Sequence, residues 1–288
     1  MYNRLFLSEE ELPRPYENRR SDKMRICVAG ACGRMGRRIL ELAGAAEDVV
    51  IAGAFDLPRF AGTEIMAGIE CGRPQLVRVQ ENAAAEIARA DVLIEFTAAS
   101  ACTGNVRLAV EAGKPSVVGT TGLSAAQKAE LAAYAKQTGI VYAPNMSVGV
   151  NLLFKLTSEV ARVLGLDYNV EITEVHHNLK KDSPSGTAVR LAECAAQALG
   201  LSYPGDAVHG RHGLTGERPR NQIGVHALRG GDVVGEHAVS FIGQGERLEL
   251  VHKAHNRDNF VRGALRAARF VLNAAPGLYD MQDVLGLK

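Results

Sequence analysis

Short apolar segments alternate with amphipathic segments through the first half of the chain. The apolar segments have the length of buried strands, and the stretches between them carry apolar residues at helical spacing, as at Met35, Ile39 and Leu42. We predict strands at 25–30, 49–55, 91–97, 116–122 and 139–144, and helices at 31–46, 101–112, 124–138 and 148–165. Strands and helices that alternate in this way form a parallel sheet covered on both faces.

The pattern changes after residue 165. All eight histidines lie between His176 and His255, and so sharp a shift indicates a second domain. Its predicted elements are strands at 169–177, 223–229, 232–242 and 246–252, a helix at 186–200 and a Gly/Arg-rich loop at 209–224. They predict a mixed α+β domain whose neighbouring strands are antiparallel. A last helix, predicted at 260–273, can pack back onto the first domain.

A glycine-rich turn follows the first predicted strand and opens the first predicted helix. Gly30, Gly33 and Gly36 have the spacing GxxGxxG, a variant of the dinucleotide-binding fingerprint. Such a turn lets the backbone approach a pyrophosphate, whose charge is met by N–H groups at the helix N-terminus and by Arg34. Asp56 ends the second strand, where a carboxylate can accept hydrogen bonds from ribose hydroxyls. A tight structural turn alone would explain the glycines, but the strand, helix and acid together favour a dinucleotide site.

These observations predict an α/β protein with an N-terminal Rossmann-type dinucleotide-binding domain and a second, mixed α+β domain. The first domain is expected to comprise residues 24–147 and 258–288, and the second residues 148–257. Residues 1–23 contain two prolines and a dense mix of charges, which predicts a flexible N-terminal extension. The extension lacks the apolar run of roughly 7–15 residues that a secretory signal needs.

Composition narrows the possible partners. Hydrophobic residues make up 47% of the 288 residues and charged residues 23%, as in soluble globular proteins. With 33 Lys and Arg against 32 Asp and Glu, the net charge of +1 supplies no global positive field, so we expect no nucleic-acid partner. No segment approaches the ~20 apolar residues of a membrane span, so no membrane partner is expected. Five cysteines without a CxxC pair indicate a reduced, cytoplasmic compartment.

The segment 174–189, EVHHNLKKDSPSGTAV, concentrates side chains capable of chemistry. A strand delivers His176 and His177 into a loop that carries Lys180, and residues 184–187 then open a helix. Cations beside helix N–H groups suit a small carboxylate, and histidine or lysine can transfer a proton. A surface strand end or a solvated loop would explain the histidines or the lysines taken alone. No metal site is expected, because the chain has no HExxH motif and no His/Cys set at closed-site spacing.

Six motifs resemble, in order, those of the 4-hydroxy-tetrahydrodipicolinate reductase (dihydrodipicolinate reductase) family. They are GACGRMGR (30–37), GTTG (119–122), NMSVGVN (145–151), EVHHNLKKDSPSGTA (174–188), RGGDVVGEH (229–237) and GERLELVHKA (245–254). The similarity runs from about Met24 to Leu287, and its most specific part is the segment with the paired histidines, the lysine and SGT.

The resemblance implies an NADH- or NADPH-dependent reductase of diaminopimelate and lysine biosynthesis. Its substrate would be the dicarboxylate 4-hydroxy-tetrahydrodipicolinate, and its second domains would bind the substrate and pair in a homotetramer. His176 would be the catalytic acid/base and Lys180 the proton donor. Substrate contacts are implied for His177, Ser185, Gly186 and Thr187. Cofactor contacts are implied for the pyrophosphate turn (Gly30, Ala31, Cys32, Gly33, Arg34 and Met35), the ribose acid (Asp56), the nicotinamide side (Gly119, Thr120 and Thr121) and a closing segment (Ala143, Pro144, Asn145 and Met146).

Two features depart from the family's pattern. The N-terminal extension is unusual, and Leu57 and Pro58 separate Asp56 from Arg59, where the family often has a basic residue directly after the acid. Because Asp56 repels a 2′-phosphate whereas Arg59 can reach one, we expect NADH to be used at least as well as NADPH.

The residues alone leave two other function classes open. One is a different two-domain nicotinamide oxidoreductase, such as a sugar dehydrogenase or an aspartate-semialdehyde dehydrogenase. The latter would need a nucleophilic cysteine in the second domain, where Cys194 has no base nearby in the sequence. The other is a non-catalytic nucleotide-sensing protein, which would have no use for the histidine, lysine and SGT segment.

Overall fold

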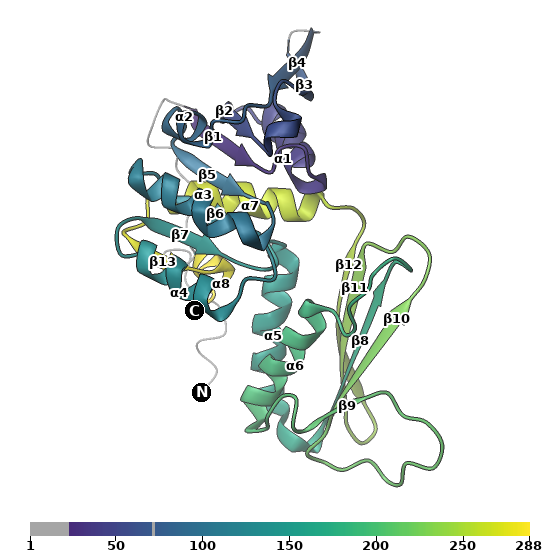
Figure 1. The fold of residues 1–288 in the computed structure, drawn as a ribbon. Helices are drawn as coiled ribbons and strands as arrows, with labels where there is room; N and C mark the ends of the chain where they lie inside the picture. The colour runs from purple at the N-terminus through teal and green to yellow at the C-terminus, as the bar shows by residue number, and fades with distance from the viewer. Residues whose placement is uncertain (1–22, 71–72) are drawn as a thin grey trace.

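The computed structural model describes residues 23–70 and 73–288, which form two sheets with flanking helices and a separate hairpin (Figure 1). The N-terminal extension predicted for residues 1–23 lies outside the described residues except for Lys23. The predicted α/β class with a Rossmann-type first domain and a mixed second domain is confirmed. The domain boundaries themselves stay a prediction.

The first sheet has six parallel strands in the order β13-β7-β6-β5-β1-β2. Its strands are β1 (Met24–Ala29), β2 (Val49–Phe55), β5 (Val92–Glu95), β6 (Ser116–Val118), β7 (Gly139–Tyr142) and β13 (Gly277–Tyr279). The connecting helices are α1 (Arg34–Gly44), α2 (Ala83–Ala88), α3 (Ala99–Glu111), α4 (Ala125–Tyr134), α7 (Asp258–Val271) and α8 (Met281–Leu285).

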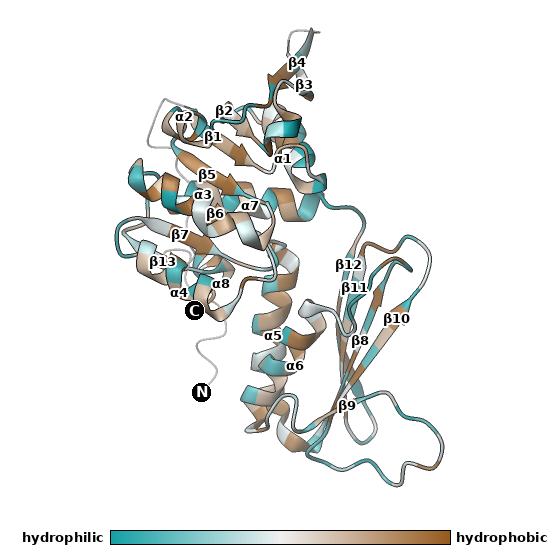
Figure 2. Cartoon of the chain, in the orientation of Figure 1, coloured by the Kyte–Doolittle hydropathy of each residue, from teal (hydrophilic) through white to brown (hydrophobic). Residues whose placement is uncertain are grey.

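Both faces of this sheet are buried, because successive strand residues point to opposite sides. Ile26 and Val28 join the core made with α1, α7 and α8. Cys27 and Ala29 join a second core beneath α2 and α3. The strands in this part of the chain are accordingly apolar over most of their length (Figure 2). Because both faces are buried, the strands appear in the sequence as short continuous apolar runs rather than as alternating apolar and polar residues.

The second sheet has five strands in the order β12-β11-β8-β10-β9. They are β8 (Asn169–His176), β9 (Ala207–His209), β10 (Ile223–Arg229), β11 (Gly235–Ile242) and β12 (Arg247–Ala254). Helices α5 (Val148–Leu164) and α6 (Gly186–Leu199) pack on one face of it, around a core that includes Leu153, Leu191 and Phe241. The opposite face carries no helix in the described chain (Figure 1).

The prediction that neighbouring strands of this sheet are antiparallel is correct for β8, β11 and β12 but wrong for β10. Strand β10 runs parallel to β8, and the short β9 runs parallel to β10. The physical reason is the crossover between β8 and β10, which contains α6 and β9 and returns the chain in its original direction. The parallel register places Arg229 opposite His176.

Several short elements were not predicted. They are the hairpin of β3 (Glu64–Glu70) and β4 (Arg73–Arg78), the helices α2 and α8, the strands β9 and β13, and the 3-10 turns η1 (Pro58–Phe60) and η2 (Gly165–Asp167). The expectation that the C-terminal helix packs back onto the first domain is confirmed, since α7 lies against α1. Among the described residues, no helix combines the length and apolar character needed to cross a membrane.

Candidate active site

The glycine turn connects β1 to α1 and is packed tightly against the helix. A Cβ atom at Gly36 would lie 2.1 Å from the carbonyl oxygen of Gly30, so only glycine allows the first turn of α1 to approach so closely. Gly30 has a φ of +76°, which also favours glycine. No side chain caps the N-terminus of α1, which starts at Arg34. The uncapped N–H groups and the glycines at 30, 33 and 36 fit a pyrophosphate.

Asp56 lies beside this turn and is fixed by two backbone groups. Its Oδ2 accepts a hydrogen bond from the N–H of Cys32 at 2.8 Å, and its Oδ1 accepts one from the N–H of Leu57 at 2.8 Å. Burial, together with the Asp56 carboxylate, raises the pKa of the Cys32 thiol, which therefore stays neutral in the turn. The Arg59 guanidinium lies 4.8 Å from the centre of the Phe60 ring. Asp56 is thus held against the glycine turn, and the Arg59 guanidinium contacts the Phe60 ring.

A cavity of about 420 Å³ opens next to the glycine turn. Nine of the predicted cofactor residues line it: Gly33, Arg34, Met35, Gly119, Thr120, Thr121, Pro144, Asn145 and Met146. Four lining residues were not predicted: Phe96, Thr97, Arg257 and Phe260. The remaining predicted cofactor residues do not line the cavity: Gly30, Ala31, Cys32, Asp56 and Ala143.

A buried carboxylate connects two walls of this cavity. Glu95 is fully buried at the end of β5 and accepts hydrogen bonds from the hydroxyls of Thr97 and Thr120. The amide of Asn105 donates a further, longer bond of 3.4 Å to it. The backbone N–H of Thr97 also donates to the Thr120 hydroxyl oxygen at 2.9 Å. The loops that follow β5 and β6 are therefore tied to each other at the wall of the cavity.

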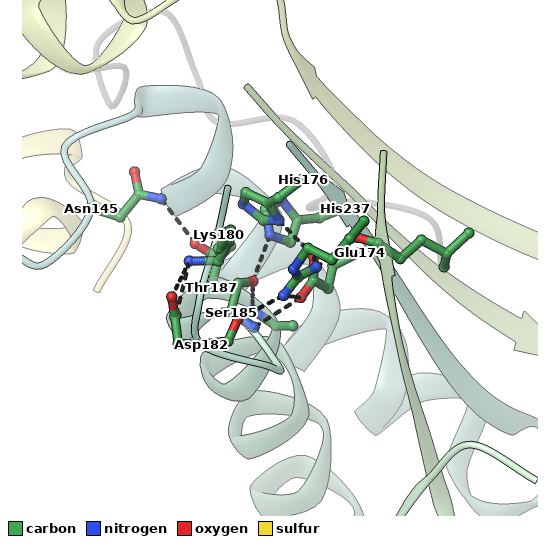
Figure 3. A network of polar contacts seen from close by, with 11 residues as sticks. Asn145, Glu174, His176, Lys180, Asp182, Ser185, Thr187 and His237 are labelled. Atoms are coloured by element: carbon green, nitrogen blue, oxygen red, sulfur yellow. Dashed lines mark hydrogen bonds and ion pairs between the residues drawn. The ribbon is translucent and has the colours of Figure 1, made fainter. Parts of the chain in front are cut away.

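Four of the predicted catalytic and substrate residues gather around the N-terminus of α6: His176, Lys180, Ser185 and Thr187 (Figure 3). His176 ends β8, Lys180 lies in the following loop, and Ser185 caps α6 by accepting a hydrogen bond from the N–H of Ala188 at 3.2 Å. The Lys180 ammonium contacts both carboxylate oxygens of Asp182, at 2.9 and 2.8 Å. The hydrogen bond from Lys180 lowers the pKa of Asp182. A cation is thus held beside the start of the helix.

Glu174 lies at the centre of this cluster and was not predicted. Its side chain is 0% exposed and accepts two hydrogen bonds from Arg229, at 2.8 and 2.9 Å. It also contacts Nδ1 of His176 at 2.5 Å and accepts the N–H of Ser185 at 3.0 Å. Burial raises the pKa of Glu174, but the hydrogen bonds from Arg229 and His176 outweigh burial and lower it overall. Glu174 therefore stays ionised inside the protein.

His237 on β11 completes the cluster. Its Nε2 lies 3.1 Å from the Ser185 hydroxyl, and its ring meets that of His176 edge to face, with 5.2 Å between centroids. Burial, followed by the nearby His176, lowers the pKa of His237 to about 3, so this ring is neutral near pH 7. Burial also lowers the pKa of His176, although Glu174 opposes that effect. The two rings thus form one packed unit at the end of the sheet.

One hydrogen bond joins the two groups of predicted residues. The amide of Asn145, which lines the cavity, donates to the hydroxyl of Thr187 at 3.1 Å (Figure 3). The cofactor cavity therefore adjoins the first turn of α6.

His177 follows β8, and its N–H donates to the carbonyl of Val233 at 2.8 Å, while its Nδ1 is buried without a hydrogen-bond partner. Within residues 23–70 and 73–288, no group of three His, Cys, Asp or Glu side chains suits a metal ion.

For some of the site residues that were not predicted, the sequence nevertheless contains a signal. Glu174 precedes His176 by two residues on one strand, so both face the same side of the sheet. Arg229 and His237 are the first and last residues of the motif RGGDVVGEH. Thr97 is the last residue of a predicted strand (91–97), at the sheet edge where ligands bind in open α/β folds. Arg257 and Phe260 gave no such signal, because they reach the cavity only through the return of α7.

The fold and the site define a two-domain oxidoreductase that uses a nicotinamide dinucleotide. Family models for dihydrodipicolinate reductase match nearly all of the described chain, the N-terminal model over residues 24–146 and the C-terminal model over residues 149–285. The chain belongs to the dihydrodipicolinate reductase family.

Curated relatives agree with this assignment, and one solved structure shares the fold. A 4-hydroxy-tetrahydrodipicolinate reductase from Anaeromyxobacter sp. (strain Fw109-5) is 52% identical over 265 residues, covering 91% of this chain and 98% of the relative. One from Citrifermentans bemidjiense is 48% identical, covering 92% and 100%. The dipicolinate-bound dihydrodipicolinate reductase from Paenisporosarcina sp. TG-14 has a similar fold, with a TM-score of 0.72, 23% identity and coverage of 91% and 98%.

Proposed function

We propose that this chain reduces 4-hydroxy-tetrahydrodipicolinate to tetrahydrodipicolinate with NADH or NADPH, in the biosynthesis of diaminopimelate and lysine. This is the reaction for which two relatives, 52% and 48% identical, are named. The hydrogen bond between Asn145 and Thr187 carries the proposal, because it joins a cavity suited to a dinucleotide to a helix N-terminus suited to a carboxylate. A reductase needs these two sites side by side.

The first domain holds the cofactor. The backbone from Gly30 to Met35 meets the pyrophosphate, and Asp56 accepts hydrogen bonds from the adenosine ribose. Residues 119–121 would hold the nicotinamide, and residues 143–146 would close over it. A reduced nicotinamide bound there supplies the hydride. The ties from Glu95 to Thr97 and Thr120 keep the walls of this part of the cavity in place.

The N-terminus of α6 and the loop before it hold the substrate's carboxylates. The substrate carries two negative charges, which His177, Lys180 and the N–H groups of Gly186 and Thr187 neutralise and orient. Ser185 contributes differently, because its N–H is bonded to Glu174 and its hydroxyl oxygen accepts the Ala188 N–H. It shapes the first turn of α6, which presents the two following N–H groups.

His176 and Lys180 transfer the protons of the reaction. Conversion of 4-hydroxy-tetrahydrodipicolinate to tetrahydrodipicolinate takes up one hydride and one proton and releases the 4-hydroxyl group as water. Delivery of the hydride to one atom of the substrate leaves negative charge on a neighbouring atom, and a proton from a nearby cation neutralises it. Lys180 is the proton donor, and His176 acts as the acid/base. Both lie at the N-terminus of α6, within the cluster of Figure 3.

Both cofactors are used, and NADH works at least as well as NADPH. The Asp56 carboxylate suits a ribose with free hydroxyls and repels a 2′-phosphate. Arg59 is the nearest cation after it along the chain, and it rests on Phe60, from which it can turn toward a phosphate. The cation therefore offsets part of the repulsion that Asp56 exerts.

The chain assembles as a homotetramer through its second domain and acts in the cytoplasm. Support for the assembly comes from the uncovered face of the second sheet, where Leu228, Ile242 and Val251 are exposed. Apolar residues on an open sheet face favour contact with another copy. Support for the compartment comes from the described cysteines, all of which are free thiols.

The experiment that tests these roles is steady-state kinetics of His176→Ala and Lys180→Ala with a parallel titration of the cofactor. Each variant should lose on the order of 10²–10⁴-fold in kcat, the range for a positioned proton-transfer group, and should bind the cofactor nearly as wild type does. Wild-type turnover in both variants would remove this cluster from the mechanism.

A further inference from the structure

We propose that Glu174 is a positioning residue that fixes the ring of His176, so that Nδ1 is bonded and Nε2 is presented to the substrate. The proposal rests on the proposed function, in which His176 transfers a proton, and adds the group that prepares the ring for that step. Figure 3 shows Glu174 beside His176 and Ser185, both of which it contacts.

The contact between the carboxylate and the ring determines where the ring's hydrogen lies. Oε2 of Glu174 is 2.5 Å from Nδ1 of His176. An ionised carboxylate only accepts hydrogen bonds, so Nδ1 must carry a hydrogen. In the neutral ring Nε2 is then free of hydrogen, and in the imidazolium Nε2 carries the proton that can be transferred. The carboxylate thus selects one of the two ring nitrogens for chemistry.

Glu174 is itself held rigidly. It is fully buried, where an ionised carboxylate needs several hydrogen bonds to persist. Arg229 supplies two of them in a bidentate contact, and the N–H of Ser185 supplies another at 3.0 Å. Because Ser185 is the N-cap of α6, one carboxylate links the His176 ring to the helix that holds the substrate. Ring and substrate therefore share one support.

Gly235 lies next to Nε2 of His176 and has no side chain that could cover this nitrogen. A Cβ atom at Gly235 would lie only 3.0 Å from Nε2 of His176, so any side chain there would crowd this nitrogen. The His237 ring packs edge to face against His176 and limits its rotation. The ring is thus bonded at Nδ1, packed on one side and unobstructed by Gly235 at Nε2.

The charges that face His176 allow a test in which two variants have opposite effects. Those groups are Glu174 on β8, Lys180 in the following loop, Arg229 on β10 and the neutral His237 on β11. Burial lowers the pKa of His176, Glu174 raises it, and Lys180 and Arg229 lower it. Removing the charge of Glu174 must therefore lower the pKa of His176, whereas removing the charge of Arg229 must raise it.

The experiment compares Glu174→Gln with Arg229→Gln in the full-length protein. The pKa of His176 is measured by NMR on histidine-labelled protein, with its signal identified by its loss in His176→Ala. The dependence of kcat/KM on pH is measured alongside. We expect the pKa of His176, and the limb of the profile that tracks it, to move to lower pH in Glu174→Gln and to higher pH in Arg229→Gln. In Glu174→Gln, kcat near pH 7 should also fall, by on the order of 10–10²-fold, with little change in KM.

A matched control shows that the effect is specific. Glu86 is another buried glutamate, bonded by Arg89 at 3.1 Å and by the N–H of Ala54 at 3.4 Å, but it lies in the first domain. Glu86→Gln should leave the pKa of His176 unchanged.

Two outcomes would overturn the proposal: an unchanged pKa of His176 in both test variants, or a shift of the same sign in both. If Glu174→Gln does not fold, the direction of the shift in Arg229→Gln decides. Wild-type turnover in His176→Ala would instead contradict the proposed function, whatever Glu174 does.

Discussion

Replacing Gly36 with alanine should separate α1 from the glycine turn and weaken binding of the dinucleotide. The added Cβ would lie 2.1 Å from the carbonyl oxygen of Gly30 and 2.8 Å from the Cα of Ala31. Both are backbone atoms, so neither can turn aside. Ordinary contact begins at 3.4 Å, so the helix must move away from the oxygen by the difference, about 1.3 Å.

The size of the effect follows from this displacement. Overpacking of this kind costs ~1–3 kcal/mol, and the better helix propensity of alanine offsets up to ~1 kcal/mol. Hydrogen bonds to a charged group contribute ~1.5–3 kcal/mol each, and a shift of more than an ångström breaks at least one to the pyrophosphate. The Kd for NADH should therefore rise by about 10–100-fold.

The assay is calorimetric titration of NADH into both proteins, with the melting temperature measured with and without cofactor. Gly104→Ala is the control, because Gly104 lies within α3 and a Cβ atom added there would meet no heavy atom within 4 Å beyond the backbone of its own helix. It should leave the Kd unchanged and raise stability by ~0.5–1 kcal/mol. If folded Gly36→Ala binds NADH as wild type does, the close approach has no bearing on cofactor binding.

Three further predictions test other parts of the site and fold. Asp56→Ser should shift the ratio of the kcat/KM values for NADPH and NADH toward NADPH at fixed ionic strength, because it removes a charge that repels the 2′-phosphate. A wild-type preference for NADPH above about tenfold, or ~1.4 kcal/mol, would contradict this role of Asp56. Pyridine-2,6-dicarboxylate should inhibit competitively with the substrate and much more strongly than a monocarboxylate, and equal inhibition by the two would argue against recognition of paired charges. Burial raises the pKa of Glu171, but hydrogen bonds from Arg211, His226 and Arg218 lower it from 4.5 to about 2. Glu171 should therefore stabilise the fold above pH ~4.5 and lose that contribution, up to ~3 kcal/mol, as the pH falls toward 2; urea unfolding should show a smaller acid loss in Glu171→Gln.

The first domain could be predicted well because its signals are local. A doubly covered parallel sheet produces short apolar runs, and the glycine turn and Asp56 stand at fixed offsets from two of them. The strands β9 and β13, of three residues each, are too short for any periodicity to be detected. The part of the cavity formed by Arg257 and Phe260 depends on a helix that returns from the far end of the chain.

The candidate catalytic cluster could be predicted only in part, for a reason of topology. His176, Lys180 and Ser185 lie within one short segment, so the sequence placed them together. Arg229 reaches Glu174 because β10 runs parallel to β8, with Arg229 in register with His176. Antiparallel pairing was expected there, and a wrong strand direction hides every contact that crosses the two strands. A buried charge pair such as Arg229 and Glu174 can be predicted only when the register between β8 and β10 is known.

The most direct test of the central claim is an assay of purified protein with freshly generated 4-hydroxy-tetrahydrodipicolinate, in which the loss of reduced-nicotinamide absorbance is followed. We predict that one equivalent of NADH or NADPH is oxidised for each tetrahydrodipicolinate formed. A folded protein that binds the cofactor but oxidises none of it in the presence of this substrate would contradict the account.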